Sequence, residues 1–223
     1  MEIHKHLIIT LDGPAGAGKS TVAQGLARRL GISYLDTGAM YRAMTLKALR
    51  LKINLEDEKA LAELARQTVI DFKEMPEGPM HVMLDGEDVA VAIRSTEVTN
   101  NTFYTARVGG VRELMVTWQR AIAQRRSLVT DGRDQGTVAF PKANYKFYVD
   151  ASIEERAGRR LRELTAAGKT VDFELLKKEM AERDHKDFTR AVGPLKKADD
   201  AIVIDSSGLD VEGTVDKIMK FIK

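Results

Sequence analysis

The chain has 223 residues, with 35 lysines and arginines against 33 aspartates and glutamates, and it contains no cysteine. This length fits one α/β domain with an insertion, or two small domains, and suffices to bury a hydrophobic core. The net charge of +2 gives little support to nucleic-acid binding, and the lack of cysteine excludes a disulfide framework. Apolar runs are strand-sized and the N-terminus has no long apolar stretch, so we expect a soluble, cytoplasmic protein.

A glycine-rich segment, GPAGAGKST, lies between an apolar run at 7–11 and a helical pattern at 22–30. Its spacing matches GxxxxGK[ST], in which backbone N–H groups cradle phosphates, the lysine reaches the outer phosphates and the hydroxyl meets Mg²⁺. We therefore predict an ATP site in which Lys19 is catalytic and Ser20 binds the metal. The predicted ATP-binding residues of this loop are Gly13, Pro14, Ala15, Gly16, Ala17, Gly18, Lys19, Ser20 and Thr21.

The next segment is predicted to form a strand at 32–36 and two helices, at 39–51 and 57–66. Thr37 is a plausible N-cap for the first of these helices. Between residues 69 and 92 the pattern changes to short β-like runs with an Asp-Gly turn signal at 85–86. This stretch is predicted to be a small antiparallel insertion, either a flap that faces the substrate or a stabilising addition.

The remaining chain alternates predicted helices and strands. Helices are expected at 108–124, 152–167, 172–190 and 210–222, and strands at 127–130, 145–149 and 201–205. Such alternation predicts a parallel sheet with helices on both faces and with ligands at the carboxyl ends of its strands. Polar motifs follow three predicted strands, after Leu11, Leu35 and Thr130.

Asp131 ends one of these strands, where phosphate-loop enzymes place the carboxylate that orients magnesium. An Asp-Gly turn is the alternative, but Arg133 and Asp134 follow at once and favour a site. We predict Asp131 as a catalytic and metal-binding residue. Arg42 and Arg133 are candidates for clamping an acceptor phosphate, because a planar guanidinium can bind two phosphate oxygens at once.

Arg183, Asp187 and Arg190 are spaced four and three residues apart, so they share one face of the predicted helix. Such a face can bind a phosphate and a sugar hydroxyl together. The alternative is a solvated ladder of ion pairs that adds a few tenths of a kcal/mol. The arginine-rich helix upstream and the phosphate loop favour the binding site.

Together these motifs resemble those of the bacterial cytidylate kinases, which are nucleoside monophosphate kinases. Six motifs carry the resemblance, in the family's order and along the whole chain. They are GPAGAGKST (13–21), LDTGAMYR (35–42), VRELM (111–115), DGRDQGTVAFP (131–141), DASIEERAGRR (150–160) and ERDHKDFTRAVGPL (182–195).

The resemblance implies an α/β fold, a P-loop three-layer sandwich with a five-stranded parallel sheet. It places the core at 1–61 and 107–223, an inserted antiparallel domain that binds the nucleoside monophosphate (NMP) at 62–106, and a helical lid at about 156–171. It also implies the reaction, transfer of the γ-phosphoryl group of ATP to CMP or dCMP, with Mg²⁺ as the cofactor. We expect a monomer whose partners are these nucleotides, with no nucleic acid and no membrane among them.

The resemblance also implies roles for individual residues. Arg42 and Arg133 would be catalytic, and Arg156 and Arg159 would join the loop in binding ATP. The residues implied to bind the acceptor are Thr37, Arg112 and Asp134 at the cytosine, Arg183 and Asp187 at the sugar, and Arg42, Arg133 and Arg190 at phosphates.

One segment departs from the family's pattern. Phe103, within TNNTFYTA (99–106), stands roughly where the family has a hydroxyl that faces the base. Thr102 or Thr105 could replace that hydroxyl after a small shift.

Two alternatives compete with this interpretation. A kinase for another small acceptor, such as UMP, another nucleotide or shikimate, would share the loop and the core. A nucleotide-binding switch would need no acceptor, but the Asn-Lys-x-Asp element with which GTP switches read the base does not occur in the sequence.

Overall fold

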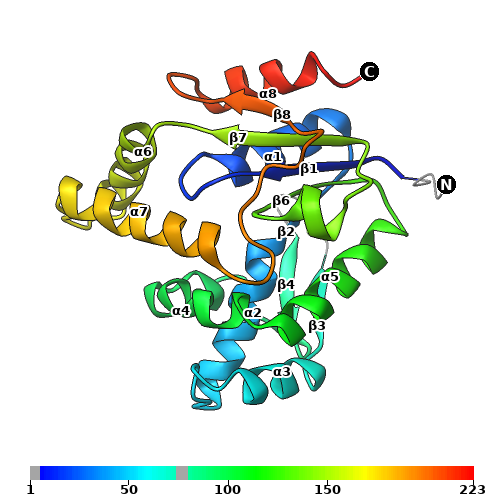
Figure 1. Ribbon diagram of the computed structural model, residues 1–223, viewed down its shortest axis with the longest axis vertical. Helices are drawn as coiled ribbons and strands as arrows, with labels where there is room; N and C mark the ends of the chain where they lie inside the picture. Colours follow the sequence, from blue (N-terminus) through cyan, green and yellow to red (C-terminus); the bar gives the residue numbers. More distant parts are fainter. Residues whose placement is uncertain (1–5, 74–79) are drawn as a thin grey trace. The chain divides into compact units, whose positions relative to one another are not determined.

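The computed structural model describes residues 6–73 and 80–223 and divides the chain into two compact units (Figure 1). The first unit contains the chain up to residue 33 and from residue 126 onward, and the second contains residues 34–125. This division is wider than the 62–106 insertion expected from the sequence, and that narrower boundary stays a prediction. Among the described residues, no helix combines the length and the apolar character that a membrane crossing needs.

A five-stranded sheet with the order β2-β6-β1-β7-β8 confirms the predicted α/β class. The pairs β1–β6, β1–β7 and β7–β8 are all parallel. Ile8, Ile9 and Leu11 of the central strand β1 have no exposed surface, because helices cover a parallel sheet on both faces. The strands are β1 (Ile8–Asp12), β2 (Ser33–Asp36), β6 (Leu128–Gly132), β7 (Tyr145–Asp150) and β8 (Ile202–Asp205).

Helices α6, α7 and α8 of the first unit begin within one residue of their predicted starts, and each has a capping side chain; the π-helical turn η2 was not predicted. Ser152, Asp172 and Asp210 each precede a helix and accept a hydrogen bond from the N–H group three residues on, which satisfies one of the free donors of the first turn. The helices of this unit are α1 (Lys19–Leu30), α6 (Ile153–Ala166), α7 (Phe173–Thr189), α8 (Val211–Met219) and a π-helical turn, η2 (Gln135–Ala139).

The second unit contains the predicted antiparallel sheet. Its strands have the order β3-β4-β5, and Asp85 and Gly86, both with positive φ, form the turn between β4 and β5. The elements of this unit after β2 are α2 (Thr37–Arg50), α3 (Glu58–Arg66), β3 (Ile70–Lys73), β4 (His81–Leu84), β5 (Glu87–Asp88), the 3₁₀ turn η1 (Ala92–Arg94), α4 (Thr96–Ala106) and α5 (Gly109–Ala123). Residues 74–78, between the β-like runs of the sequence, and Pro79, the first residue of the second run, lie outside the described residues.

Two local expectations are wrong. The N-cap of α2 is Asp36, whose Oδ1 accepts the N–H of Ala39 at 2.8 Å, and Thr37 is already helical. Both residues are good caps, but only Asp36 has the extended backbone that a cap needs, because it still belongs to β2. Helix α4 was not expected at all, because its threonines, asparagines and aromatic residues have low helix propensity.

The core of the second unit is formed by the apolar faces of its helices and of the small sheet. Leu61 of α3 and Met115 of α5 have no exposed surface and belong to one cluster with Val82 and Leu84 of β4. The small sheet therefore shares a hydrophobic core with the helices that flank it in sequence.

Replacing Leu61 by alanine should lower the free energy of unfolding by about 2–5 kcal/mol, because it leaves a cavity in this core. The matched control is Leu51→Ala, since Leu51 is 56% exposed and its loss should change stability by less than about 0.5 kcal/mol. Urea unfolding of the two variants measures the difference. Equal losses would contradict the assignment of Leu61 to the core.

Candidate active site

The glycine loop joins the end of β1 to the start of α1, so it lies at the carboxyl end of the sheet. Gly18, with φ 82°, is the N-cap of α1 and provides no side-chain cap. The first N–H groups of α1 are therefore left for a ligand, and the helix dipole favours an anion there. At Gly13, with φ 147°, a Cβ atom would lie 2.0 Å from the carbonyl oxygen of Val149, so only glycine fits.

Lys19 is the first residue of α1 and is almost completely buried. Its Nζ donates a hydrogen bond to the carbonyl oxygen of Pro14 at 2.7 Å. Burial, with the repulsion of Arg133 as a smaller cause, lowers the pKa of Lys19 to about 7 although Asp131 and Asp12 oppose the shift. An anion beside Nζ would restore the charged form, so the position suits a polyphosphate.

Ser20 and Asp131 meet at the ends of α1 and β6. The hydroxyl of Ser20 donates to Oδ2 of Asp131 at 2.7 Å, and Asp131 is 7% exposed. Mg²⁺ is held in phosphoryl-transfer sites by one or two protein oxygens together with substrate phosphates and water. Among the described residues no three His, Cys, Asp or Glu side chains form a metal-binding group, so this pair fits such a shared site and not an all-protein cage.

Asp12, at the end of β1, links the glycine loop to the segment that follows β6. Its two carboxylate oxygens accept the N–H groups of Gln135 and Gly136 at 2.8 and 2.7 Å. Burial raises the pKa of Asp12 to about 6 in spite of these two bonds and of the attraction of Lys19, and Asp134 adds to the rise. Gly136 allows this approach, because a Cβ atom there would lie 3.3 Å from Oδ2 of Asp12.

Arg133 forms a partly buried cluster with Asp187 of α7 and with Arg190, the C-cap of that helix. Nε of Arg133 donates to Oδ2 of Asp187 at 2.7 Å, and Nη1 of Arg190 lies 3.7 Å from Oδ1 of Asp187. Arg190 also approaches Asp134, with 3.9 Å between Nη2 and Oδ1. Burial alone would raise the pKa of Asp187, but the attraction of Arg133 lowers it below its usual value.

The arginines of α6 contact the backbone of the glycine loop. Arg156 donates to the carbonyl oxygen of Ala15 at 3.0 Å and forms a buried ion pair with Asp184 of α7, and Arg159 donates to the carbonyl oxygen of Ala17 at 3.3 Å. Arg183 is exposed on α7, and its charge acts on both Lys19 and Asp187. The first unit therefore brings together the loop, Asp131, Arg133, Asp134, Arg156, Arg159, Arg183, Asp187 and Arg190 of the predicted site.

The remaining predicted site residues belong to the second unit. Thr37 is buried in the first turn of α2, and Nη2 of Arg42 donates to Oδ2 of Asp36 at 2.9 Å. Arg112 of α5 is buried, with its guanidinium carbon 5.5 Å from the centre of the Tyr41 ring. Their predicted contacts with an acceptor nucleotide stay predictions.

Phe103 and the two threonines near it, Thr102 and Thr105, already have contacts within the second unit. The guanidinium carbon of Arg107 lies 5.6 Å from the centre of the Phe103 ring and 5.3 Å from that of Tyr104. The hydroxyl of Thr102 donates to the carbonyl oxygen of Val98 at 2.7 Å, and that of Thr105 shares a hydrogen bond of 2.7 Å with Thr45. A base contact from Thr102 or Thr105 would have to compete with these bonds.

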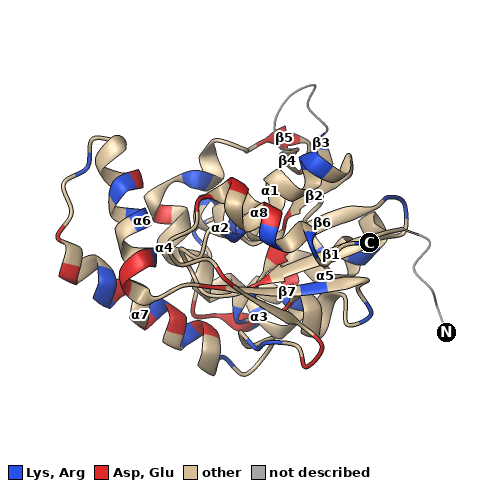
Figure 2. Cartoon of the chain, turned by 90° about the horizontal axis from the view of Figure 1, so that it is seen from above, with Lys and Arg blue, Asp and Glu red and all other residues tan. Residues whose placement is uncertain are grey.

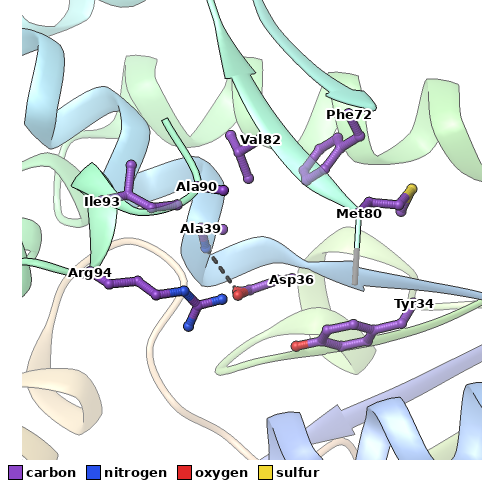
Figure 3. A pocket seen from close by; sticks show the side chains of 9 residues that line it. All are labelled: Tyr34, Asp36, Ala39, Phe72, Met80, Val82, Ala90, Ile93 and Arg94. Carbon is purple, nitrogen blue, oxygen red and sulfur yellow. Dashed lines mark hydrogen bonds between the residues drawn. The ribbon is translucent and has the colours of Figure 1, made fainter. Parts of the chain in front are cut away.

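A small pocket in the second unit lies between β4, η1 and the start of α2 (Figure 3). Its side chains include Phe72, Val82 and Ile93, with Asp36 and Arg94 on its polar side. The pocket has a volume of about 20 Å³. That is room for about one water molecule, so a nucleotide base does not fit there in this structure.

Reasoning from the sequence missed two residues in this site, Asp12 and Asp184. Asp12 precedes the loop motif and looks like the last residue of a strand, and Asp184 looks like one more charge on a polar helix. Their partners lie far away in the chain, 123 residues for Asp12 with Gln135 and 169 for Asp184 with Ala15. Only the tertiary structure reveals them, although the position of Asp12 at a strand end was a usable signal.

A parallel sheet, a glycine loop that leads into a helix and a carboxylate at the end of the neighbouring strand define a P-loop phosphotransferase. The family model for cytidylate kinase matches residues 9–223. A cytidylate kinase from Desulforamulus reducens is 51% identical and one from Geobacillus sp. (strain WCH70) is 50% identical, each alignment covering at least 98% of both chains. The chain belongs to the cytidylate kinase family, whose members are ATP-dependent nucleoside monophosphate kinases.

A likeness in fold alone extends further. An uncharacterized protein from Eubacterium ventriosum matches 98% of this chain and 98% of its own with a TM-score of 0.53 at 16% identity. This similarity supports the fold and carries no information on the substrate.

The shifted pKa of Asp12 predicts a pH-dependent contribution to stability. Its folded-state pKa of about 6 lies above the ordinary aspartate pKa of 3.8, so the folded chain holds the proton more tightly than the unfolded chain. The stabilisation that results is lost as the pH rises from about 4 to above 6. Relative to Asp12→Asn, which does not titrate, the parent should lose about 2 kcal/mol of unfolding free energy between pH 4.5 and pH 7.0. Urea unfolding at pH 4.5 and 7.0 measures it, and a difference between the two proteins that is independent of pH would contradict the shift.

Proposed function

We propose that the protein transfers the γ-phosphoryl group of ATP to CMP or dCMP and releases ADP with CDP or dCDP. The observation that carries this proposal is the family match over residues 9–223, in a chain whose glycine loop keeps the lysine, the serine and the neighbouring carboxylate together. The chain's own residues supply positioned positive charge and hydrogen-bond donors, which is what phosphoryl transfer requires of a protein.

The donor end of the reaction is assigned to the glycine loop. The free N–H groups at the start of α1 bind phosphate oxygens of ATP, and Nζ of Lys19 moves from the carbonyl of Pro14 to the β- and γ-phosphates. Charge grows on the transferred group in the transition state, and a lysine that is buried before ATP arrives stabilises that charge without water to screen it.

Magnesium is assigned to the pair Ser20 and Asp131, whose oxygens have the chemistry that the ion prefers. When bound, the ion neutralises charge on the phosphates and orients them. The protein's part is to keep both oxygens at the same edge of the sheet, through the parallel register that places Asp131 opposite Leu11 of β1.

The acceptor end is assigned to Arg133, Asp187 and Arg190, with Arg183, Asp134, Thr37, Arg42 and Arg112 as further contacts. Asp187 holds the guanidinium of Arg133 beside its own carboxylate. A nucleotide can therefore bind to both side chains at once, with a phosphate at Arg133 and a sugar hydroxyl at Asp187. Preformed pairs of this kind reduce the ordering that substrate binding requires.

Further parts of the proposal are that the enzyme works as a monomer in the cytoplasm and binds neither nucleic acid nor membranes. The near-balance of its charges supports the absence of nucleic-acid binding. We also propose that residues 62–106 act as the NMP-binding segment and residues 156–171 as a lid that excludes water, since an open site would allow hydrolysis of ATP.

Replacing Lys19 by alanine should lower kcat by about 10²–10³-fold, because it removes a charge that acts in the transition state. Arg28→Ala is the matched control, since it removes an exposed cation from the same helix and should leave kcat within about twofold. Coupled assays with ATP, Mg²⁺ and CMP measure both. A Lys19→Ala enzyme within tenfold of the parent would refute the assignment of the loop.

The substrate is tested by a scan of acceptors with ATP and Mg²⁺. We expect CMP and dCMP to give the highest kcat/KM and ADP release to rise sharply when either is added. If UMP, AMP or dTMP gave a higher kcat/KM than CMP and dCMP, the proposed acceptor would be wrong. If no acceptor changed the rate of ATP turnover, a nucleotide switch would be favoured instead.

A further inference from the structure

The glycine loop is held from outside by two side chains that converge on one residue. The N–H of Ala15 donates to Oδ1 of Asp184 at 3.1 Å, and its carbonyl oxygen accepts from Nη1 of Arg156 at 3.0 Å. Arg156 and Asp184 also pair with each other, and each is 7% exposed. Both polar groups of Ala15 are therefore fixed by a buried ion pair that comes from two different helices.

The next two residues of the loop also lie against this helix pair. Gly16 approaches so closely that a Cβ atom there would lie 2.7 Å from Cε of Met180 on α7 and 3.2 Å from Cβ of Arg156 on α6. The carbonyl oxygen of Ala17 accepts from Arg159, one helical turn beyond Arg156. Three successive loop residues thus contact the α6–α7 pair.

The ion pair is supported by a further hydrogen bond of Arg156 and by the packing of the two helices. Nε of Arg156 donates to the carbonyl oxygen of Ala151, just before α6, at 3.0 Å. The helices themselves pack through a small apolar cluster that contains Ala157, Leu176 and Met180. Figure 2 shows basic and acidic residues interleaved along α6 and α7, but the pair Arg156–Asp184 differs from the surface pairs because it is buried.

Resting on the function proposed above, we propose that Asp184 and Arg156 are positioning residues that hold the glycine loop in its phosphate-binding shape. A loop whose N–H groups are kept for phosphates cannot use them to stabilise itself, so its shape has to be set by contacts at other atoms. Asp184 accepts the N–H of Ala15, and Arg156 donates to the carbonyl oxygen of the same residue. Loss of the Asp184 carboxylate charge leaves the loop less ordered and lowers its affinity for ATP.

Asp184→Asn separates this role from direct binding of phosphate by Arg156. The variant keeps Arg156 in the chain but removes its buried counter-charge. If Arg156 served ATP only as a phosphate ligand, release from Asp184 would leave ATP affinity unchanged or increase it. If the pair positions the loop, ATP affinity falls.

The experiment measures ATP dissociation constants by calorimetry without any acceptor, and hydrogen exchange of the peptide that covers the loop. For Asp184→Asn we expect an ATP Kd at least about tenfold higher, which is about 1.4 kcal/mol, and faster exchange of the loop amides. The matched control is Glu179→Gln, which removes an exposed carboxylate from the same helix and should change neither. Arg156→Lys, which keeps the charge but cannot reach two carbonyls and Asp184 together, should resemble Asp184→Asn.

Thermal unfolding is measured in parallel, and all binding is compared well below the lowest midpoint. A lower midpoint with unchanged ATP affinity and unchanged loop exchange would overturn the proposal and leave the ion pair as a tie between two helices. Failure of the parent protein itself to bind ATP would refute the proposed function, which is a different result from a parent that binds and a variant that binds equally well.

Discussion

A phosphate loop is constrained by the fact that the N–H groups that will bind the ligand cannot also stabilise the loop. In this protein the constraint is met by contacts at other atoms. The loop begins at Gly13, whose missing side chain allows contact with the backbone of β7, and continues past α6 and α7, which hold Ala15 and Ala17. The sheet and two helices outside the motif thereby fix the conformation of the phosphate-binding loop.

The same arrangement explains the electrostatics around the loop. Removing Lys19 from water lowers its pKa to about 7, and removing Asp12 raises its pKa to about 6, although each attracts the other's charged form. Desolvation therefore outweighs attraction at both groups in the ligand-free protein. A nucleotide polyphosphate places negative charge beside the Lys19 ammonium and so stabilises its charged form. Binding of the ligand therefore offsets the free energy that the burial of Lys19 costs in the ligand-free protein.

The sequence predicts those parts of the structure that depend on local pattern. The strand, loop and helix from residue 8 to 30, the starts of α6, α7 and α8 and the Asp-Gly turn were predicted, because spacing and backbone conformation determine them. Helix α4 was missed because tertiary packing overrides its weak propensity: Val98 and Thr105 are buried against other elements. Spacing predicted the face of Arg183, Asp187 and Arg190, and the family resemblance added the remaining acceptor residues. The approach of Arg133 and Arg190 to Asp187 depends on tertiary contacts that no local pattern encodes.

Helix α7 shows how one rigid element can serve both ends of the proposed reaction. Arg183 and Asp187 share one face, which Arg190 continues as the C-cap, and Asp184 is turned about 100° from Arg183 and about 60° from Asp187 around the helix axis. The groups assigned to the acceptor and the carboxylate that meets the glycine loop therefore lie on adjacent parts of the same helix surface. Because a helix does not stretch, a shift of the acceptor face moves the loop contact by a similar amount. In-line transfer tolerates little error in the distance between its partners, and a single helix that touches both sites limits that error.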